Sequence, residues 1–598
     1  MALTKPPGTI NKWRLSSMSK SSDKQYLIQY LQYLKRHKRR LTISLLSIPL
    51  IALIHISQPL ILKHAIDNVF LNKQYDQLHL VASLLGLAVV GEFTLRSLQS
   101  FLFQHIGQHT VTDIRHDLFQ HVTTLRMSYF DKTPQGVLTS RLTSDLESLN
   151  DSFATGVVTL IADILTIIGI LTAMFLLSVE LTLVTLLITP PLFIFVNICR
   201  KKLRTQYNRI RSTIGKLNAS IQEQLEGLTI IQQYNRQTVN EAQFDELNTA
   251  YRKATISSVT YDALLYSVIE SMASITLGIV IGYALGFQQN DAITIGLLVA
   301  FIDYIQKFFQ PLKEISNKFA ILQHALASLE KIFGLFNETD TMPVKDRALD
   351  HFSGKIHIDD VHFHYPSHPD KPVLNGISFE VKPGNTVAIV GPTGSGKSSI
   401  IKVLLGLYEG YKGSITLDDH ELRDLDPRSI REHMVTVGQD ARLFNRSIAF
   451  NITLGNPDIS DDDVLEALAM ANATHIIEAL PNGIHSPINQ FGQQLSAGEA
   501  QLIGFARALA SPAPLILLDE ATANIDSLNE RAIQKATERL LKEKTVIVIA
   551  HRLSTIQHAD TIIALKNGQI IEKGDHPSLI KADGFYSKLY RMQFETTQ

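Results

Sequence analysis

Long apolar runs in the first half of the chain and short alternating segments in the second half predict two different kinds of structure. Six runs in the first half are rich enough in apolar residues to be candidate spans of a bilayer. They are Leu41–Leu62, Leu78–Phe103, Phe153–Leu177, Leu181–Ile198, Ala263–Phe287 and Ile293–Phe309. From Gly354 onward, short apolar strands alternate with helical patterns, which is typical of an α/β domain. The pattern therefore predicts a six-span membrane part followed by a soluble α/β part.

Basic residues orient the predicted spans. The clusters Lys35–Arg40 and Arg200–Arg204 lie at ends that are cytoplasmic if the N-terminus is inside. Under this orientation the outward connections are short, and the cytoplasmic connections, Gln104–Ser152 and Lys201–Asp262, are long. Both long connections carry mixed charge at helical spacing, so we expect the membrane helices to continue into the cytosol.

Turn-forming residues interrupt each long connection once. Phe130–Gly136 contains a proline and a glycine, and Gly227 lies alone within a helical pattern. A short transverse helix could meet a soluble domain at either break. The alternative for both is a plain turn between helices.

Several charged residues lie within the predicted spans. Glu92 and Arg96 are one helical turn apart and can pair with each other. Asp163, Glu270 and Asp303 have no partner nearby in the sequence, and charges at membrane depth usually face a bundle interior or a water-filled cavity. Glu270 and Asp303 are therefore candidates for a translocation cavity that favours cationic or amphipathic substrates. Interhelical hydrogen bonding is the alternative, and it is favoured for Asp163.

The overall composition narrows the function further. The formal net charge of the 598 residues is −1, so no basic excess points to a nucleic-acid partner. A single cysteine, Cys199, excludes intrachain disulfides and fits a cytosolic soluble part. Met1–Ser22 is polar and lacks the apolar core of a cleavable signal, so we expect internal segments to enter the membrane.

A phosphate-binding loop is the clearest chemical motif in the chain. Gly391–Ser398 matches the spacing G-x-x-x-x-G-K-[ST], follows the apolar strand Thr386–Val390 and precedes a helical pattern. Glycines let backbone N–H groups approach phosphates, and the helix N-terminus adds positive charge. Lys397 would neutralise the β- and γ-phosphates, and the Ser398 hydroxyl would ligate Mg²⁺. The predicted contacts of the loop are Gly391, Pro392, Thr393, Gly394, Ser395, Gly396, Lys397, Ser398 and Ser399.

Two further strands end in polar residues that suit the same site. Leu515–Glu520 ends in two acids, of which Asp519 would hold Mg²⁺ and Glu520 would polarise the attacking water. The strand Val546–Ala550 is followed by His551. Ligands of open α/β sheets bind at the carboxyl ends of the strands, so we expect these side chains to converge on the phosphate loop.

A family resemblance rests on Leu495-Ser-Ala-Gly-Glu499, which resembles the signature motif of ABC-type ATPases and lies just upstream of the strand that ends in Asp519. With six spans, the chain resembles a type IV ABC exporter half-transporter, most like the multidrug-resistance-like subunits of bacterial heterodimeric exporters. The resemblance implies an α-helical six-span transmembrane domain at residues 1–336, a linker at 337–353, and an α/β P-loop ABC nucleotide-binding domain at 354–598. The two breaks in the long connections resemble the coupling helices of this family.

The resemblance also assigns roles to residues outside the phosphate loop. It implies that Tyr365 stacks on adenine and that Gln439 is the Q-loop glutamine, which senses Mg²⁺ and the membrane domain. It further implies that His551 is the switch histidine at the γ-phosphate and that Asp526 is the D-loop aspartate. Mg²⁺ would then be held by Ser398, Gln439 and Asp519.

Departures from the family pattern point to a partner. The usual signature is L-S-G-G-Q, whereas this chain has Ala497 and Glu499, and both changes are expected to weaken nucleotide contact. Gly438 replaces a common proline, and Gln490 replaces an acid. In this family each ATP lies between the phosphate loop of one subunit and the signature of the other. The residues Leu495, Ser496, Ala497, Gly498 and Glu499 would thus act in trans, and an intact loop beside an altered signature predicts one member of an asymmetric pair. A homodimer is the alternative.

These observations together predict an ATP-driven exporter of amphipathic small molecules, of multidrug type, in the bacterial inner membrane, with both termini cytoplasmic. The expected cofactors are ATP and Mg²⁺, the catalytic residues Glu520, His551 and Lys397, and the partners a second half-transporter and the lipid bilayer, with no nucleic acid. The alternatives are a lipid or lipid A-type flippase, a peptide exporter and an ATP-gated channel. The six spans argue against a soluble ABC ATPase. The spacing of residues in the sequence does not identify the transported substrate.

Overall fold

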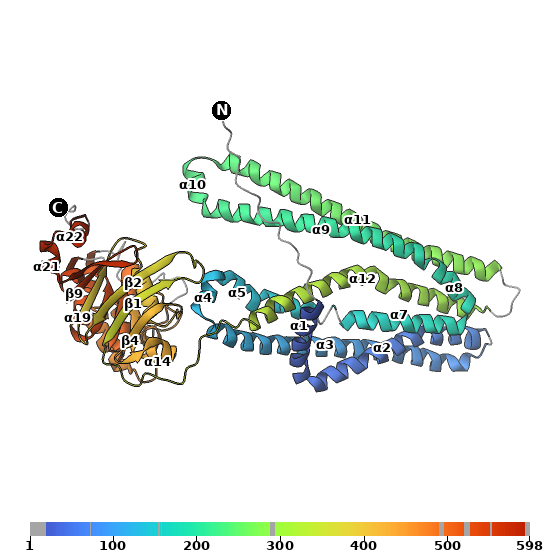
Figure 1. Ribbon diagram of the computed structural model, residues 1–598. Coiled ribbons are helices and arrows are strands. Elements are labelled where there is room, and N and C mark those ends of the chain that lie inside the picture. Colours follow the sequence, from blue (N-terminus) through green and yellow to red (C-terminus); the bar gives the residue numbers. More distant parts are fainter. Residues whose placement is uncertain are drawn as a thin grey trace, which may run out of the picture. The chain divides into compact units, whose positions relative to one another are not determined.

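The computed structural model describes residues 20–71, 73–152, 156, 158–286, 293–439, 441–488, 495–519, 527–550 and 553–592. The chain divides into two compact units (Figure 1). The first contains the residues up to His121 together with Leu138–Asn337. The second contains Val122–Val137 and the residues from Glu338 onward. A short piece of the N-terminal half therefore belongs to the same unit as the C-terminal half.

The first unit is helical. Its elements are α1 (Lys20–Arg36), α2 (Lys38–His64), the π-helix η1 (Ala65–Phe70), η2 (Tyr75–Gln77), α3 (Leu78–Thr124), α5 (Gln135–Leu142), α6 (Ser144–Asp151), α7 (Val158–Leu177), α8 (Val179–Leu187), α9 (Thr189–Glu226), α10 (Leu228–Gln233), α11 (Gln237–Gly286) and α12 (Ile295–Phe336). Within the described residues, six helical segments are long and apolar enough to cross a membrane, which confirms the predicted number of spans. The continuation of α3, α9 and α11 far beyond membrane length confirms the predicted helical extensions.

Two prolines lie beside a break in the fourth span. The helix breaks at Ile188, between α8 and α9, and Pro190 and Pro191 occupy the first positions of α9. A proline is tolerated there because its missing N–H would have no partner within the helix. The prolines therefore begin a helix and do not interrupt one.

Charged residues of the spans form ion pairs, some within one helix and some between helices. The predicted Glu92–Arg96 pair is confirmed, with 2.7 Å between the carboxylate and the guanidinium, and the His55 ring lies 3.0 Å from the same carboxylate. The statement that Asp303 lacks a partner nearby in the sequence is wrong, because Lys307, one turn further along α12, approaches it to 3.2 Å.

The other two intramembrane acids also contact lysines of α12. Asp163 on α7 pairs with Lys318, and Glu270 on α11 pairs with Lys313. Ion pairs between helices support the structural alternative over a free charge in a cavity. Glu270 nevertheless keeps 66% of its side chain exposed, so of these acids it is the one more accessible to a ligand.

The second unit is built on two sheets. Its elements are α4 (Met127–Lys132), β1 (Ile356–His364), β2 (Pro372–Val381), β3 (Thr386–Val390), α13 (Lys397–Leu404), β4 (Lys412–Leu417), β5 (His420–Glu421), α14 (Pro427–Glu432), β6 (Met434–Val437), α15 (Ile448–Thr453), α16 (Asp461–Met470), α17 (Thr474–Glu478), α18 (Ala497–Ala510), β7 (Leu515–Asp519), α19 (Ser527–Glu543), β8 (Thr545–Ile549), α20 (Leu553–Gln557), β9 (Thr561–Lys566), β10 (Gln569–Gly574), α21 (His576–Lys581) and α22 (Phe585–Tyr590), with short 3-10 turns at Leu422–Asp424 and Gly483–His485. The strands of the described residues form a sheet of order β2-β1-β4-β5 and a sheet of order β10-β9-β3-β8-β7-β6.

The central strands of the larger sheet are buried on both faces. All five residues of β3 are buried, and they alternate between two cores: Val387 and Ile389 join one, Ala388 and Val390 the other. Successive side chains of a strand point to opposite faces, so a strand covered on both sides has to be apolar throughout. This explains why the strand before the phosphate loop is a continuous apolar run. The α/β prediction for the C-terminal half is confirmed.

A short helix adjoins each predicted break of the long connections. The helix α4 ends at Lys132, directly before Thr133 and Pro134, and α10 begins directly after Gly227. All six residues of α10 are at least partly exposed, including Leu228 at 46% and Ile230 at 62%. Exposed apolar side chains on a six-residue helix suit contact with another surface.

Candidate functional site

The carboxyl ends of four neighbouring strands meet at one edge of the larger sheet. The strands β3, β8, β7 and β6 are adjacent and parallel, with Ile549 opposite both Ile389 and Asp519. The phosphate loop follows β3, Asp519 ends β7, and Gln439 lies two residues beyond β6 in an exposed position. The fold thus brings these three predicted elements together. The other predicted residues near these strands, namely Glu520, Asp526 and His551, lie outside the described residues, as does Gln490.

Two glycines of the phosphate loop are required by the close approach of neighbouring backbone. Gly396 has a φ of +104°, and a Cβ atom there would lie 2.8 Å from the carbonyl oxygen of Val373. A Cβ atom at Gly391 would collide with the carbonyl oxygen of Leu565. The loop is also fixed by a hydrogen bond of 3.1 Å from the Gly568 N–H to the Ser395 carbonyl. The glycine spacing of the motif therefore has a packing reason in addition to the approach of phosphates.

Lys397 is turned back onto the loop. Its ammonium donates hydrogen bonds to the carbonyl oxygens of Gly391 (2.8 Å) and Pro392 (3.0 Å). Burial lowers the pKa of Lys397, while the charge of Asp519 acts in the opposite direction. The ammonium therefore lies inside the concave loop, beside the first glycine, where a bound phosphate would give it a stronger partner than two carbonyl groups.

The residues proposed to hold Mg²⁺ fit that ion in part. The Ser398 hydroxyl donates a hydrogen bond of 3.3 Å to Asp519, so the two predicted oxygen ligands face each other. Hydroxyl, carboxylate and amide oxygens together with water are the ligands that Mg²⁺ prefers. No group of three or more His, Cys, Asp or Glu side chains within the described part of the chain could hold a metal by itself. The protein thus offers few oxygen ligands, as expected for a Mg²⁺ ion that is also bound by phosphate oxygens.

Tyr365 lies beside the phosphate loop. Its hydroxyl is 2.9 Å from the Ser399 hydroxyl, and its ring meets those of Phe363 and Tyr408 edge to face at 5.1 and 5.2 Å. The Lys402 ammonium lies 5.4 Å from the centre of the ring. Tyr365 is half-buried and held by these four contacts, which suits an aromatic platform next to a nucleotide.

Tyr408 connects this aromatic group to α4, a role that no motif in the sequence indicated. Its hydroxyl lies 2.5 Å from a carboxylate oxygen of Asp131. Burial and the hydrogen bond to Asp131 raise the pKa of Tyr408, so the hydroxyl stays protonated and donates at neutral pH. Tyr408 follows the end of α13 and belongs to no motif. Only the tertiary structure brings it next to Asp131.

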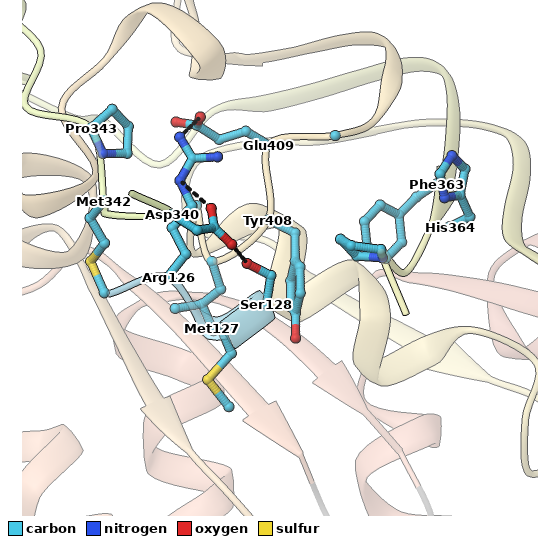
Figure 2. A pocket seen from close by; sticks show the side chains of 14 residues that line it. Arg126, Met127, Ser128, Asp340, Met342, Pro343, Phe363, His364, Tyr408 and Glu409 are labelled. Carbon is cyan, nitrogen blue, oxygen red and sulfur yellow. Dashed lines mark hydrogen bonds and ion pairs between the residues drawn. The ribbon is translucent and has the colours of Figure 1, made fainter. Parts of the chain in front are cut away.

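Charged residues join the segment after α3 to the residues after α12. Figure 2 shows the Arg126 guanidinium between Asp340 (3.7 Å) and Glu409 (3.1 Å), with the Ser128 hydroxyl donating to Asp340. Lys345 also contacts Glu409, at 2.6 Å. All of these residues except Lys345 line a pocket of about 280 Å³, and all of them belong to the second unit.

The signature segment begins α18 with an exposed N-terminus. The Ser496 hydroxyl accepts a hydrogen bond of 3.2 Å from the Glu499 N–H, and the Glu499 carboxylate accepts one of 2.6 Å from the Ser496 N–H. This capping box satisfies two N–H groups of the helix end. Ser496 and Ala497 are exposed, Leu495 and Glu499 are partly exposed, and Gly498 is buried. Glu499 therefore caps the N-terminus of α18, a structural role that the resemblance to the signature motif did not suggest.

Comparisons with known proteins match both halves of the chain. Residues 41–312 match the family model described as the ABC transporter transmembrane region, and residues 374–523 match the model described as ABC transporter. A putative ABC transporter ATP-binding protein of Streptococcus pneumoniae, exp8, is 37% identical over 90% of this chain and 91% of its own length. This chain belongs to the ABC transporter family.

Other similar proteins of the family are named for different functions. A probable multidrug resistance ABC transporter ATP-binding/permease protein of Bacillus subtilis, YheH, is 37% identical over 83% of this chain and 74% of its own. An ATP-dependent lipid A-core flippase of Thiobacillus denitrificans is 33% identical over 96% of this chain and its whole length. A bacterial Atm1-family ABC exporter solved with ATP bound superposes with a TM-score of 0.75 at 25% identity, covering 93% of this chain and 98% of that one. This ABC transporter chain thus has an exporter fold, with membrane and ATP-binding parts in one polypeptide.

Proposed function

We propose that this ABC transporter chain is one half of an ATP-hydrolysing exporter and works as a dimer. The observation that carries the proposal is the convergence of the phosphate loop, Asp519 and Gln439 at one sheet edge, in a chain that also has six candidate spans. A nucleotide site attached to a membrane domain is the arrangement expected where ATP drives movement across the bilayer. The domain boundaries predicted at residues 336 and 354 are part of this proposal.

The catalytic roles follow from charge and position. Lys397 would leave the two loop carbonyls and neutralise the γ-phosphate, where charge develops during phosphoryl transfer. Glu520, next in sequence to Asp519, would orient the attacking water, and His551, following β8, would contact the γ-phosphate. Ser398, Gln439 and Asp519 would hold Mg²⁺, which neutralises phosphate charge when it is bound. Tyr365 would stack on adenine.

The variant Glu520→Gln tests the enzymatic part of the proposal. The amide keeps the size of the side chain and removes the carboxylate that polarises water, so we expect ATP turnover to fall by about 100-fold or more while ATP binding persists. Phosphate release and binding of a fluorescent ATP analogue would be measured on the purified protein in lipid. Glu466→Gln, an exposed change on α16, is the matched control. Near-normal hydrolysis by the Glu520 variant would refute the assigned role.

A heterodimeric assembly is proposed on the altered signature. Ala497 and Glu499 stand where the family usually has glycine and glutamine, and the Glu499 carboxylate is bound to the Ser496 N–H of its own chain. A carboxylate at this helix end would repel the γ-phosphate of a partner's ATP. We therefore assign the intact phosphate loop to one site and the altered signature to a second, weaker site of the pair. Co-purification of this chain with chains expressed beside it tests the assignment, because recovery of homodimers alone would contradict it.

The transported compound is proposed to be an amphipathic small molecule of the multidrug type. Relatives named for multidrug resistance and for lipid A-core flipping are similar to the chain over most of its length, and both names imply substrates that partition into bilayers. Lipid flipping is the second candidate. ATP-driven uptake into inside-out vesicles, with cationic dyes in one arm and a fluorescent lipid in the other, distinguishes the two, and flux only down a gradient would instead indicate a channel. We place the chain in a bacterial inner membrane with cytoplasmic termini.

A further inference from the structure

An exposed basic run marks the N-terminal end of the first candidate span. Arg36 is engaged, since its guanidinium lies 3.7 Å from Asp113 and 3.4 Å from Asp117. Four neighbouring cations are exposed, and no ion pair with another described residue is recorded for them. These four, called the basic run below, are Lys35, Lys38, Arg39 and Arg40.

The preceding helix α1 carries an exposed apolar stripe. Leu27, Ile28 and Leu31 keep 43%, 46% and 43% of their surface exposed. Lys24 lies one turn before this group and Lys35 one turn after it, so spacings of three and four residues place all five side chains on one face of α1. An apolar stripe with a lysine at each end is typical of a helix that lies in a membrane interface, where the lysine stems extend towards the headgroups.

An adjoining side of α1 is fixed to the protein. Tyr30 and Leu34 are buried, and the Tyr33 ring lies 6.3 Å from the ring of Phe333 on α12. The Tyr33 hydroxyl donates a hydrogen bond of 2.9 Å to Asp117 on α3, and burial together with this carboxylate raises the pKa of Tyr33 to about 12. The orientation of α1 is therefore set by contacts with α3 and α12, and the exposed stripe is presented by a fixed element.

We infer that the apolar stripe of α1 and the basic run form a binding surface for anionic phospholipid at the leaflet where the first span begins. The stripe would enter the boundary between headgroups and acyl chains, and the basic run would contact lipid phosphates. Because α2 begins at Lys38, two residues after α1 ends, the cations lie at the height of the headgroups once α2 crosses the bilayer. The chain would then bind anionic lipid about five-fold more tightly for each basic residue that contributes.

Charge argues against a second copy of the chain as the occupant of this surface. Two basic runs brought together would repel each other, and the exposed stripe is only three apolar residues long, which is small for a stable protein interface. Anionic lipid supplies both an apolar phase and negative charge in the same place. The apolar stripe alone could bind either a second copy of the chain or a lipid. The positive charge of the basic run favours the anionic lipid.

Reconstitution of the full-length chain into nanodiscs tests the inference. Discs of phosphatidylcholine alone would be compared with discs that also contain phosphatidylglycerol. The melting temperature would be read with a dye that reacts with Cys199, which is buried until the fold opens. We expect phosphatidylglycerol to raise the melting temperature of the unaltered chain, and high ionic strength to reduce the gain.

Two charge-matched variants make the test specific. The variant Lys35→Gln, Lys38→Gln, Arg39→Gln, Arg40→Gln should lose most of the gain and should retain less phosphatidylglycerol, measured by lipid mass spectrometry after purification. A control with Lys382→Gln, Lys412→Gln, Lys573→Gln and Lys581→Gln, all exposed in the second unit, should keep the gain. If the fourfold variant fails to fold, the pair Lys38→Gln, Arg39→Gln should show a partial loss.

Several outcomes would overturn the inference. An equal gain for the unaltered chain and the fourfold variant would do so, as would the absence of any difference between the two kinds of disc. A gain produced by inorganic phosphate alone would indicate an ion site without lipid. A change of oligomeric state on Leu27→Ser, Ile28→Ser and Leu31→Ser would assign the stripe to protein contact. None of these readouts depends on transport.

Discussion

Contacts of single residues fix the conformation of the phosphate loop. The Lys397 ammonium is held by the carbonyls of Gly391 and Pro392 and faces the same side of the loop as Asp519. The glycines are fixed by neighbouring backbone, so phosphate binding requires little rearrangement of the main chain. The loop therefore combines a backbone fixed by its neighbours with one buried positive charge.

Replacement of that charge should separate folding from nucleotide binding. In Lys397→Met we expect the stability without nucleotide to change by about 1 kcal/mol or less, because an uncharged side chain removes a costly burial of charge along with two hydrogen bonds. The stabilisation by ATP, about 2.7 kcal/mol at a hundredfold excess over Kd, should disappear. Melting curves with and without ATP measure both effects. The exposed change Lys412→Met should keep the full ATP response, and retention of that response in Lys397→Met would contradict the role of the lysine.

The sequence predicts loop residues well because their spacing is dictated by local geometry. Gly391, Lys397 and Ser398 follow from one turn between one strand and one helix. Asp519 follows from the rule that strand ends meet at one edge. Tyr408 and Asp131 could not be predicted, since they come from distant parts of the chain and belong to no motif. The prediction that Asp303 has no partner nearby in the sequence was wrong for a different reason. Lys307 lies one helical turn away and could have been recognised from the sequence.

At the scale of elements, an irregular helix end joins two spans. The π-helix η1 places Asp67 over the start of α12, where its carboxylate accepts hydrogen bonds from the Gly296 N–H (2.8 Å) and the Thr294 hydroxyl (2.6 Å). A carboxylate at a helix N-terminus is favoured by the partial positive charge there. The Asp67 carboxylate thus connects the end of α2 to the start of α12.

Gly296 has no room for a side chain. A Cβ atom would lie 2.5 Å from the Asp67 carboxylate and 2.6 Å from the Lys63 carbonyl, so Gly296→Ala should lower the free energy of unfolding by about 1–3 kcal/mol. Thermal unfolding followed through Cys199 labelling measures the change. Gly282→Ala on α11 has open space around the new methyl and should be neutral or stabilising by about 1 kcal/mol. Equal effects of the two substitutions would disprove the close contact.

The hydrogen bond from Tyr408 should stabilise α4. Tyr408→Phe keeps the ring contacts with Phe363 and Tyr365 but leaves Asp131 without its donor, at a cost of about 1 kcal/mol. We expect faster amide hydrogen exchange across Met127–Lys132 and unchanged ATP binding. Tyr411→Phe, which removes a hydroxyl contact to Glu421 elsewhere in the unit, serves as the control. Unaltered exchange in α4 of the Tyr408 variant would argue that the segment is held by the contacts of Arg126 and Ser128 instead.

Elements were predictable where periodicity was strong. The six spans and their long extensions follow from apolar length and helical charge spacing, and the described helices match them. Apolar length alone did not predict the break of the fourth span at Ile188, and the two prolines that follow it lie in the first turn of α9, where proline is favoured. The π-helix gives no sequence signal, since its extra residue is accommodated by tertiary contacts.

At the scale of the whole molecule, the altered signature bears on activity. A homodimer would place Ala497 and Glu499 in both composite sites, so the purified chain alone should hydrolyse ATP poorly. The double variant Ala497→Gly, Glu499→Gln should raise that activity about tenfold or more, because glutamine removes the repulsive charge and still fits the capping box. Steady-state phosphate release is the measurement. Robust, cooperative hydrolysis by the unaltered chain would count against the asymmetric pair.

The division of the chain into two units also constrains how the protein is made. Residues 122–137 belong to the unit that resumes at Glu338, so no single cut of the polypeptide separates the two. A fragment that starts at residue 338 would carry Asp340 and Glu409 without Arg126. During translation, Arg126 leaves the ribosome about 210 residues before Asp340 and 283 residues before Glu409. Completion of the ATP-binding unit therefore has to wait for the intervening spans to be synthesised, which orders membrane insertion before assembly of the nucleotide site.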